Sequence, residues 1–201
     1  MQDLFCLTMT DFKTRGTYLE IGSGSPVDSS NTYLLEYSYG WQGISVEYNG
    51  ALAQQFSAVR KNMCINADAT RINYKKLLND SCFPSRIDYL SLDIDPPPNT
   101  YRALELCLES DRRFSVITFE HDYYSHGDKY MNLSRNLLSS SGYLLIVAGL
   151  KVFGKPFEDW WVDPNFVDCK AWNPFLSELI EFMELPFYDL PFSPATVNTP
   201  Q

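Results

Sequence analysis

Short apolar stretches alternate with amphipathic stretches along most of this chain, and glycine, proline or capping residues separate them. Runs rich in β-branched and aromatic residues predict buried strands, and apolar residues at helical spacing predict helices. Strands are expected at 18–21, 43–47, 63–65, 85–95, 114–120, 143–150 and 157–162, and helices at 32–39, 50–59, 72–78, 99–108, 129–140 and 174–183. Such alternation is typical of an α/β protein with a mostly parallel sheet.

The first strand ends in a glycine turn of sequence GSGS at residues 22–25. Glycines allow the backbone to turn sharply and to lie close to a ligand. Polar residues 29–31 can cap the helix that follows, so that its free N–H groups face whatever binds at the turn. The second strand ends in Glu47, where an acid suits the hydroxyl groups of a ribose. The segment predicts a nucleotide-type cofactor, although two glycines alone also occur in ordinary strand-to-helix turns.

Two classes of cofactor fit this turn, the nicotinamide dinucleotides and S-adenosylmethionine (SAM). The dinucleotide fingerprint has a third glycine or alanine that packs the helix on the strand, and Val27 stands in its place here. Glu20, immediately before the turn, is well placed to bind a cationic amino-acid group, which SAM has and NAD lacks. The residues therefore favour SAM, and an NAD-dependent Rossmann enzyme stays as an alternative.

Several successive motifs resemble those of class I SAM-dependent methyltransferases. They are EIGSGS at 20–25, VE at 46–47 and NADA at 66–69. In addition, SNTYLLE at 30–36, GWQGISVE at 40–47 and FEDWWVDP at 157–164 are similar to the FkbM-type branch, whose members are mostly O-methyltransferases. The resemblance spans residues 17–164.

This resemblance implies a Rossmann-like fold, with a seven-stranded, mostly parallel sheet whose antiparallel last strand lies between the fifth and the sixth. It implies that Asp68 binds the adenine amino group, although the same side chain is equally suited to cap the following helix. It also implies a small hydroxylated methyl acceptor, such as a sugar. The expected cofactor-binding residues are Glu20, Gly22, Ser23, Gly24, Glu47, Asp68 and Asp93.

Acidic residues and a histidine stand at the ends of two neighbouring predicted strands. Asp93 and Asp95 precede three prolines that stop the fourth strand, and Glu120 and His121 end the fifth. Adjacent parallel strands lie about 4.8 Å apart, so these side chains are expected to meet at one edge of the crevice. One hypothesis makes His121 or Asp93 the catalytic group, with His121 as a general base for the acceptor hydroxyl. The other makes all four the ligands of a divalent cation such as Mg²⁺. A surface position for His121 is the alternative to both.

The charge of the chain limits its partners. Its formal net charge is −9 at pH 7, and lysine and arginine form no cluster that would bind a polyanion. The pairs Arg60-Lys61 and Arg112-Arg113 are expected on solvated helix ends or turns. Amino-directed DNA methyltransferases have a base-stacking aromatic after an acid and two prolines, and Pro98 takes that place here. We therefore expect a small-molecule substrate and no nucleic-acid partner.

A length of 201 residues suits one domain with a full core. Residues 1–16 are expected to form an N-terminal extension, 17–164 the SAM-binding domain, and 165–201 a tail. The tail aromatics Phe187, Tyr188 and Phe192 are expected to pack on the domain or on a partner, which includes a second copy of the chain. Trp160, Trp161 and Trp172 are expected in the core more than at the substrate.

No apolar stretch approaches the roughly 20 residues of a membrane span, and the first residues lack a signal-peptide pattern, so a cytoplasmic protein without membrane contact is expected. Five scattered cysteines predict reduced, mostly buried thiols. A second alternative function is a non-catalytic binding or assembly protein on a degenerate methyltransferase fold. Its expected sign is a crevice plugged by side chains.

Overall fold

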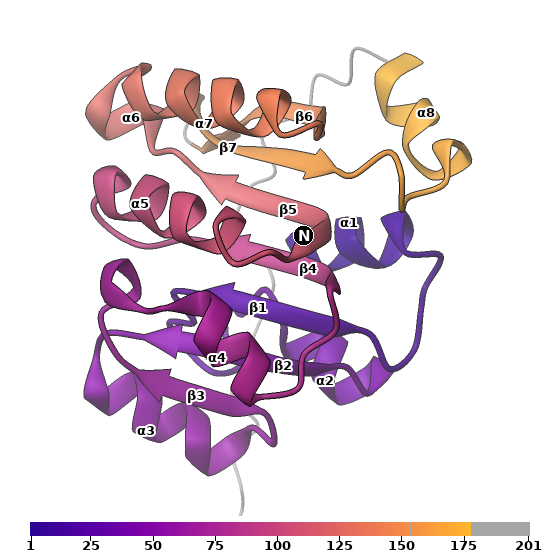
Figure 1. Ribbon diagram of the computed structural model, residues 1–201. Coiled ribbons are helices and arrows are strands. Elements are labelled where there is room, and N and C mark those ends of the chain that lie inside the picture. Colours follow the sequence, from indigo (N-terminus) through magenta and orange to yellow (C-terminus); the bar gives the residue numbers. More distant parts are fainter. Residues whose placement is uncertain (153, 178–201) are drawn as a thin grey trace, which may run out of the picture.

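The computed structural model describes residues 1–152 and 154–177, and within them the chain forms a seven-stranded sheet of order β3-β2-β1-β4-β5-β7-β6 (Figure 1). The strands are β1 (Thr17–Ile21), β2 (Gln42–Glu47), β3 (Met63–Asn66), β4 (Arg86–Leu92), β5 (Arg113–Glu120), β6 (Leu144–Val152) and β7 (Lys155–Val162). The first five are parallel, and β7 runs antiparallel to both β5 and β6. The predicted Rossmann-like sheet, with its reversed strand between the fifth and sixth, is confirmed.

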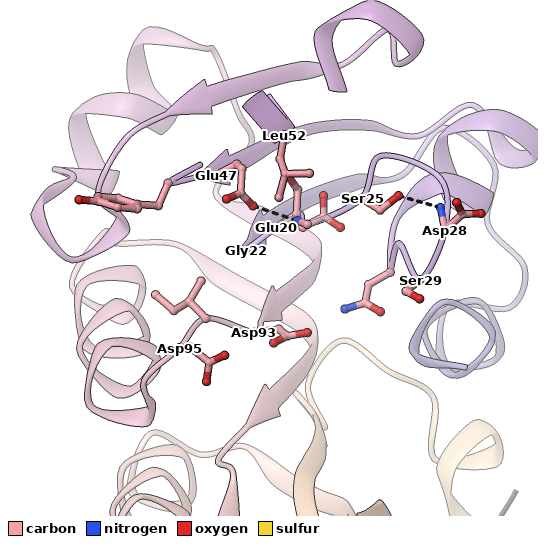
Figure 2. A pocket seen from close by; sticks show the side chains of 14 residues that line it. Glu20, Gly22, Ser25, Asp28, Ser29, Glu47, Leu52, Asp93 and Asp95 are labelled. Atoms are coloured by element: carbon pink, nitrogen blue, oxygen red, sulfur yellow. Dashed lines mark hydrogen bonds between the residues drawn. The ribbon is translucent and has the colours of Figure 1, made fainter. Parts of the chain in front are cut away.

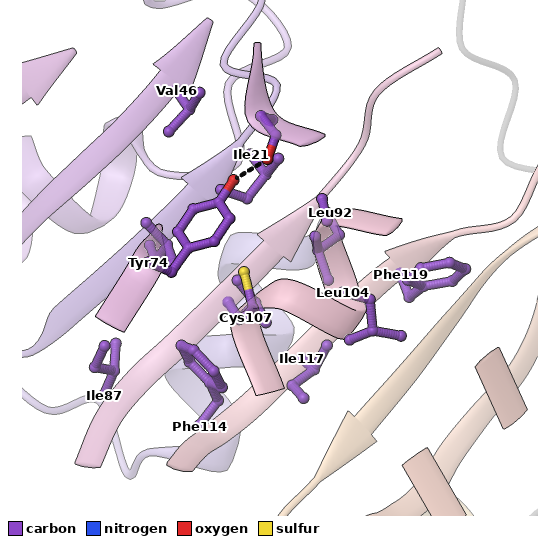
Figure 3. Packing of buried hydrophobic residues seen from close by; sticks show 14 of the residues in the cluster. Ile21, Val46, Tyr74, Ile87, Leu92, Leu104, Cys107, Phe114, Ile117 and Phe119 are labelled. Atoms are coloured by element: carbon purple, nitrogen blue, oxygen red, sulfur yellow. Dashed lines mark hydrogen bonds between the residues drawn. The ribbon is translucent and has the colours of Figure 1, made fainter. Parts of the chain in front are cut away.

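Helices cover both faces of the sheet. They are α1 (Gln2–Met9), α2 (Tyr33–Tyr39), α3 (Gly50–Val59), the 3₁₀ turn η1 (Ala69–Arg71), α4 (Tyr74–Asp80), α5 (Pro97–Leu108), α6 (Tyr123–His126), α7 (Lys129–Ser140) and α8 (Cys169–Ser177). One apolar cluster joins the sheet to α4, α5 and α7, and a second joins it to α1, α2 and α8. Figure 3 shows Leu104 and Cys107 of α5 packed among apolar side chains of β4 and β5. Burial of both sheet faces explains why its strands are nearly continuous apolar runs.

Local capping fixes where several of these elements begin. Asn49 accepts hydrogen bonds from the backbone N–H groups of Ala51 and Leu52 at the start of α3. The helix predicted at 99–108 begins two residues earlier, at Pro97, because the fixed φ of proline suits a first helical turn. The strand predicted at 85–95 ends at Leu92, so Asp93 and Asp95 lie in the loop beyond the sheet.

The N-terminal helix α1 packs into the second apolar cluster. Phe5 and Leu7 of α1 are buried, and the Phe5 ring lies 4.7 Å from the ring of Trp160, centroid to centroid. Trp160 and Trp161 are themselves buried, which confirms their predicted place in the core. The last helix begins at Cys169 rather than at Pro174, and Pro174 lies inside it. The predicted tail packing of Phe187, Tyr188 and Phe192 falls outside the described residues.

Two further expectations concern the surface and the thiols. Among the helices that the structure describes, none combines the length and apolar character needed to cross a bilayer. All five cysteines are free thiols, as predicted, but only Cys6 and Cys107 are buried, while Cys82 and Cys169 are exposed.

Candidate functional site

A pocket of about 600 Å³ opens at the C-terminal ends of β1, β2 and β4. Figure 2 shows Glu20 and Glu47 on one side of it and Asp93 and Asp95 on the other. Its wall consists of Glu20, Gly22, Ser23, Gly24, Ser25, Asp28, Ser29, Asn31, Glu47, Tyr48, Leu52, Asp93, Ile94 and Asp95. The structure thus brings six of the seven predicted cofactor-binding residues together, at the place where open α/β sheets bind ligands.

The glycine turn forms one wall of the pocket, and at Gly22 only glycine fits. Gly22 has φ +87°, and a Cβ added to it would lie 1.8 Å from the backbone oxygen of Asp93. Gly24 has φ +54°, and its N–H donates a 2.9 Å hydrogen bond to Oε2 of Glu47. The turn is therefore pressed against the end of β4 on one side and bonded to the end of β2 on the other.

Glu47 is fixed by the backbone at the tip of β2. Its Oε1 accepts a 2.7 Å hydrogen bond from the N–H of Asn49, while Oε2 accepts the one from Gly24. A carboxylate has about four acceptor sites, so two stay available for a ligand in the pocket. The position and charge of Glu47 therefore suit a pair of vicinal hydroxyl groups.

Glu20 is 1% exposed and lies beneath the turn, with both oxygens hydrogen-bonded. Thr32 Oγ1 donates to its Oε1 over 3.0 Å, and Ser45 Oγ donates to its Oε2 over 2.5 Å. Burial raises the pKa of Glu20 to about 7, against the opposing effects of these hydroxyls and of the Arg60 guanidinium. Glu20 is thus a carboxyl group that titrates near neutral pH on the floor of the pocket.

The raised pKa of Glu20 predicts how the free energy of unfolding depends on pH. A carboxyl whose pKa rises from 4.5 to about 7 on folding stabilises the native state below pH 4.5, and that stability is lost as pH rises through 7. Glu20→Gln removes the titration, so the variant should gain stability relative to wild type between pH 4.5 and 7.5, by up to about 3 kcal/mol. Urea unfolding of both proteins across this range measures the difference. A difference that stays constant with pH would contradict the raised pKa.

Sequence reasoning missed several residues of the pocket wall. Tyr48 is 80% exposed and belongs to the pocket wall, directly after Glu47 in the sequence. Asn31 is buried and donates a 3.0 Å hydrogen bond from Nδ2 to Ser91 Oγ of β4. Leu52 reaches the pocket from the first turn of α3. The signal for Tyr48 was its place directly after the acid that ends β2.

Asp68 lies outside the pocket wall, and the structure shows its capping role. Its Oδ1 accepts a 2.9 Å hydrogen bond from the N–H of Thr70 and a 2.6 Å bond from the Thr70 hydroxyl, at the start of η1. These bonds lower the pKa of the Asp68 carboxyl. The contact of Asp68 with an adenine amino group stays a prediction.

Carboxyl groups do gather at the ends of β4 and β5, as predicted. Glu120 is hydrogen-bonded to Asp93, and burial with this neighbour raises the pKa of Glu120 far above its usual range. Partial desolvation at the pocket wall, with the charges of Asp122 and Asp95, also raises the pKa of Asp93. A hydrogen bond between two carboxyl groups requires a shared proton, so Glu120 and Asp93 hold one proton between them.

His121 points away from this group, which corrects two predictions. It is fully buried; its Nδ1 accepts a 3.3 Å hydrogen bond from the N–H of Tyr123, and its Nε2 lies 3.6 Å from Oδ1 of Asp159. Asp159 in turn accepts hydrogen bonds from Arg135 at 2.7 and 2.8 Å. The ring therefore joins the packing between β5, α7 and β7, and the structure does not support it as a general base at the pocket.

The predicted metal site of Asp93, Asp95, Glu120 and His121 is not formed either. In the part of the chain that the structure describes, no three histidine, cysteine, aspartate or glutamate side chains are arranged to hold a metal ion. The physical reason is that the imidazole faces Asp159, while Glu120 is engaged by Asp93.

Arg60 was expected on a solvated helix end, and this prediction is wrong. Its side chain is buried, with Nε donating to Oε2 of Glu36 over 2.8 Å. Nη1 donates to the backbone oxygen of Pro26 and Nη2 to Thr32 Oγ1, both at 2.9 Å. Arg60 thus ties α3 to the glycine turn, and through Thr32 to Glu20.

Comparisons with known proteins bear on the fold. The sequence matches no protein-family model and no curated protein sequence. An rRNA methylase from Streptococcus thermophilus is similar in structure, with TM-score 0.53 and 12% identity over 81% of this chain and 94% of its own. An O-methyltransferase from Bacillus cereus in complex with SAH, the demethylated form of SAM, gives TM-score 0.56 and 14% identity, covering 80% of each chain.

A third similar structure is magnesium protoporphyrin IX methyltransferase from Synechocystis PCC 6803 with bound SAM. Its TM-score is 0.52 at 13% identity, covering 80% of this chain and 75% of its own. These three proteins are different kinds of methyltransferase, and their sequence identity to this chain is low, so the likeness concerns architecture. The chain has the α/β fold of class I SAM-dependent methyltransferases.

Proposed function

We propose that the protein is a SAM-dependent methyltransferase that methylates an oxygen atom of a small hydroxylated acceptor, such as a sugar. The observation that carries this proposal is the pocket, which unites a sharp glycine turn, a buried acid beneath it and a second acid at the tip of β2. The bound SAM and SAH in two of the similar structures support the choice of cofactor.

Each part of the pocket suits one part of this cofactor. The turn at Gly22 to Gly24 and the carboxyl of Glu20 lie where they would hold the methionine portion with its ammonium group. Glu47 would accept hydrogen bonds from the ribose hydroxyls, and the exposed Tyr48 ring offers an apolar face to the adenine. When bound, SAM supplies a methyl group activated by its sulfonium.

Asp93 is the pocket residue best placed to act on the acceptor. Its carboxylate lines the cavity, and its raised pKa brings it closer to the neutral range in which a general base is most effective. Asp93 would orient the acceptor hydroxyl and take its proton, while the surrounding wall aligns the two reactants.

Two alternatives are less well supported by these observations. A dinucleotide-binding enzyme accounts for the turn and for Glu47, but not for the reversed β7 between β5 and β6. A degenerate, non-catalytic protein would have its crevice filled by side chains, whereas this pocket is open. The FkbM-type assignment, a cytoplasmic location and the absence of a nucleic-acid partner remain predictions from the sequence.

Glu47→Gln tests the cofactor assignment. The amide loses the charge and one of the two acceptor oxygens, so SAM affinity should fall by about 1.5–3 kcal/mol, or roughly tenfold to a hundredfold. Isothermal titration of wild type with SAM, SAH and NAD gives the reference, and NAD should not bind. Glu109→Gln, at an exposed helix end, is the matched control and should bind SAM like wild type. Equal affinities for wild type and Glu47→Gln would remove Glu47 from the site.

A further inference from the structure

Four carboxyl groups gather beside the cofactor pocket, at Asp93, Asp95, Glu120 and Asp122. Glu120 lies beside Asp93 and Asp95 lies beside Asp122, and in each pair desolvation and the charge of the second carboxyl raise the pKa of the first. Among the described residues, none of the four forms an ion pair with lysine or arginine, in contrast to the paired acids elsewhere on the surface. The basic side chain of His126 in α6 interacts electrostatically with the group, because it opposes the rise in the pKa of Asp95. We call these four residues the acidic cluster.

Asp122 gives the acidic cluster an unusual feature. It is 3% exposed, and its Oδ1 has no hydrogen-bond donor within the part of the chain that the structure describes. It stands at the N-cap position of α6, yet its side chain makes no capping hydrogen bond. The carboxylate is therefore turned away from the N–H groups that normally satisfy an aspartate there, and toward Asp95. A buried carboxylate without a counter-charge is costly, and a bound cation would offset that cost.

The accessible surface of the acidic cluster continues into the pocket. Asp93 and Asp95 line the cavity on the side opposite Glu47 (Figure 2). Tyr124 lies near Asp122; desolvation and the charge of Asp122 help to raise the pKa of the Tyr124 hydroxyl, and the tyrosine side chain is 45% exposed. A cation bound here would have carboxylates on one side and an aromatic ring nearby, while the rest of the molecule extends toward the proposed methyl donor.

The chemistry of the cluster selects an organic cation over a metal ion. No three of its acids are arranged around one point within the described chain, as a metal would require. An ammonium group has three donors that can reach separated carboxylates, and it attracts aromatic faces.

Building on the proposed function, we infer that the methyl acceptor carries an ammonium group, held directly by Asp95 with Asp122 behind it as a second negative charge. The acceptor class is then an aminated sugar or an amino alcohol. The hydroxyl that is methylated and the ammonium group belong to the same molecule, so the cluster orients one end while Asp93 faces the other. The net charge of −9 would add long-range attraction for such a molecule.

Paired compounds that differ only in this charge test the inference. The protein, saturated with SAH, is titrated by NMR with glucosamine against N-acetylglucosamine and with ethanolamine against N-acetylethanolamine. We expect the amine of at least one pair to bind about tenfold or more tightly than its neutral partner. The same compounds, with duplex DNA and RNA, are then incubated with labelled SAM, and the amines should receive methyl groups while the nucleic acids do not.

Two variants locate the effect. Asp95→Asn should remove the preference for the amine, and because Asp95 is exposed, the variant does not depend on repacking a buried site. Asp80→Asn, an exposed acid paired with Lys76 in α4, is the matched control and should keep the preference. Equal binding within every pair, or a preference that survives Asp95→Asn, would overturn the inference alone. Failure of the wild-type protein to bind SAM or SAH would overturn the proposed function and this inference together.

Discussion

Gly22→Ala should nearly abolish cofactor binding and should lower the free energy of unfolding by about 2–5 kcal/mol. The left-handed conformation at φ +87° costs an alanine about 1–2 kcal/mol. The new methyl group would also lie 1.8 Å from the backbone oxygen of Asp93 and 2.8 Å from its carbonyl carbon. Backbone atoms cannot rotate away as a side chain does, so overpacking adds about 1–3 kcal/mol. Urea unfolding and titration with SAM measure the two effects.

Gly22→Ala should push the glycine turn and the end of β4 apart, and both of these line the cofactor pocket. The N–H of Asp93 donates a 2.9 Å hydrogen bond to the backbone oxygen of Ile21, and this contact holds the end of β4 against the turn. Pushing them apart moves Asp93 and opens the wall between donor and acceptor, so SAM affinity should fall by more than about a hundredfold.

Gly24→Ala is the control for this experiment. Gly24 also has a positive φ, +54°, but a Cβ there meets nothing within 4 Å. The substitution should therefore cost only the conformational term, about 1–2 kcal/mol. If both variants lose the same stability, the close approach of Gly22 to β4 is not the reason that this position requires glycine.

Features set by local sequence could be predicted, and they include the glycine turn and the acids Glu20 and Glu47 of the cofactor pocket. The turn and Glu47 follow directly from apolar strands that end in glycine or in an acid, so their positions depend only on where the strands stop. Parallel pairing of β1 with β2 and β4 then brings the strand ends together without any further information. The reversed β7 came from the resemblance and not from periodicity, which carries no information on strand order.

Side-chain direction and distant partners could not be predicted. His121 directly follows β5. Its ring turns toward Asp159 of β7, which lies 38 residues later in the sequence, and away from the acids that precede His121. Asp122, which was not among the predicted site residues, takes the place next to Asp95 that His121 was expected to fill. Side chains alternate between the two faces of a strand. A shift of one residue at the strand end therefore exchanges the side chain that faces the pocket with the one that faces the core.

The same limit explains Arg60. Beside Lys61 it has the pattern of a solvated helix end, and its partner Glu36 lies in a different helix. The guanidinium is enclosed by the rings of Phe56 and Tyr33, with its carbon 4.5 and 5.5 Å from their centroids. Such an environment forms only when α2 and α3 pack together, so the residues near position 60 in the sequence do not predict it.

Arg60→Met should lower the free energy of unfolding by about 3–5 kcal/mol, the usual cost of removing one partner from a buried ion pair. Methionine keeps the apolar packing but leaves the Glu36 carboxylate without its cation, although the N–H of Lys61 still donates to Oε1 over 2.6 Å. Arg60→Met/Glu36→Gln removes the unpaired charge and should recover part of the loss. Arg102→Met, which breaks an exposed pair with Glu105, should change stability by less than about 1 kcal/mol.

The loss of Arg60 should also reach the pocket, because the guanidinium donates to Thr32, and Thr32 donates to Glu20. Arg60 lowers the pKa of Glu20, so its removal should raise that pKa above 7 and leave the acid neutral at physiological pH. A neutral Glu20 holds an ammonium group poorly, so the affinity of Arg60→Met for SAM should fall at pH 7 and recover as pH rises. Calorimetric titration with SAM between pH 6.5 and 9 measures this. An affinity that is reduced equally at every pH would show that Arg60 supports the turn only by packing, and that it does not set the charge of Glu20.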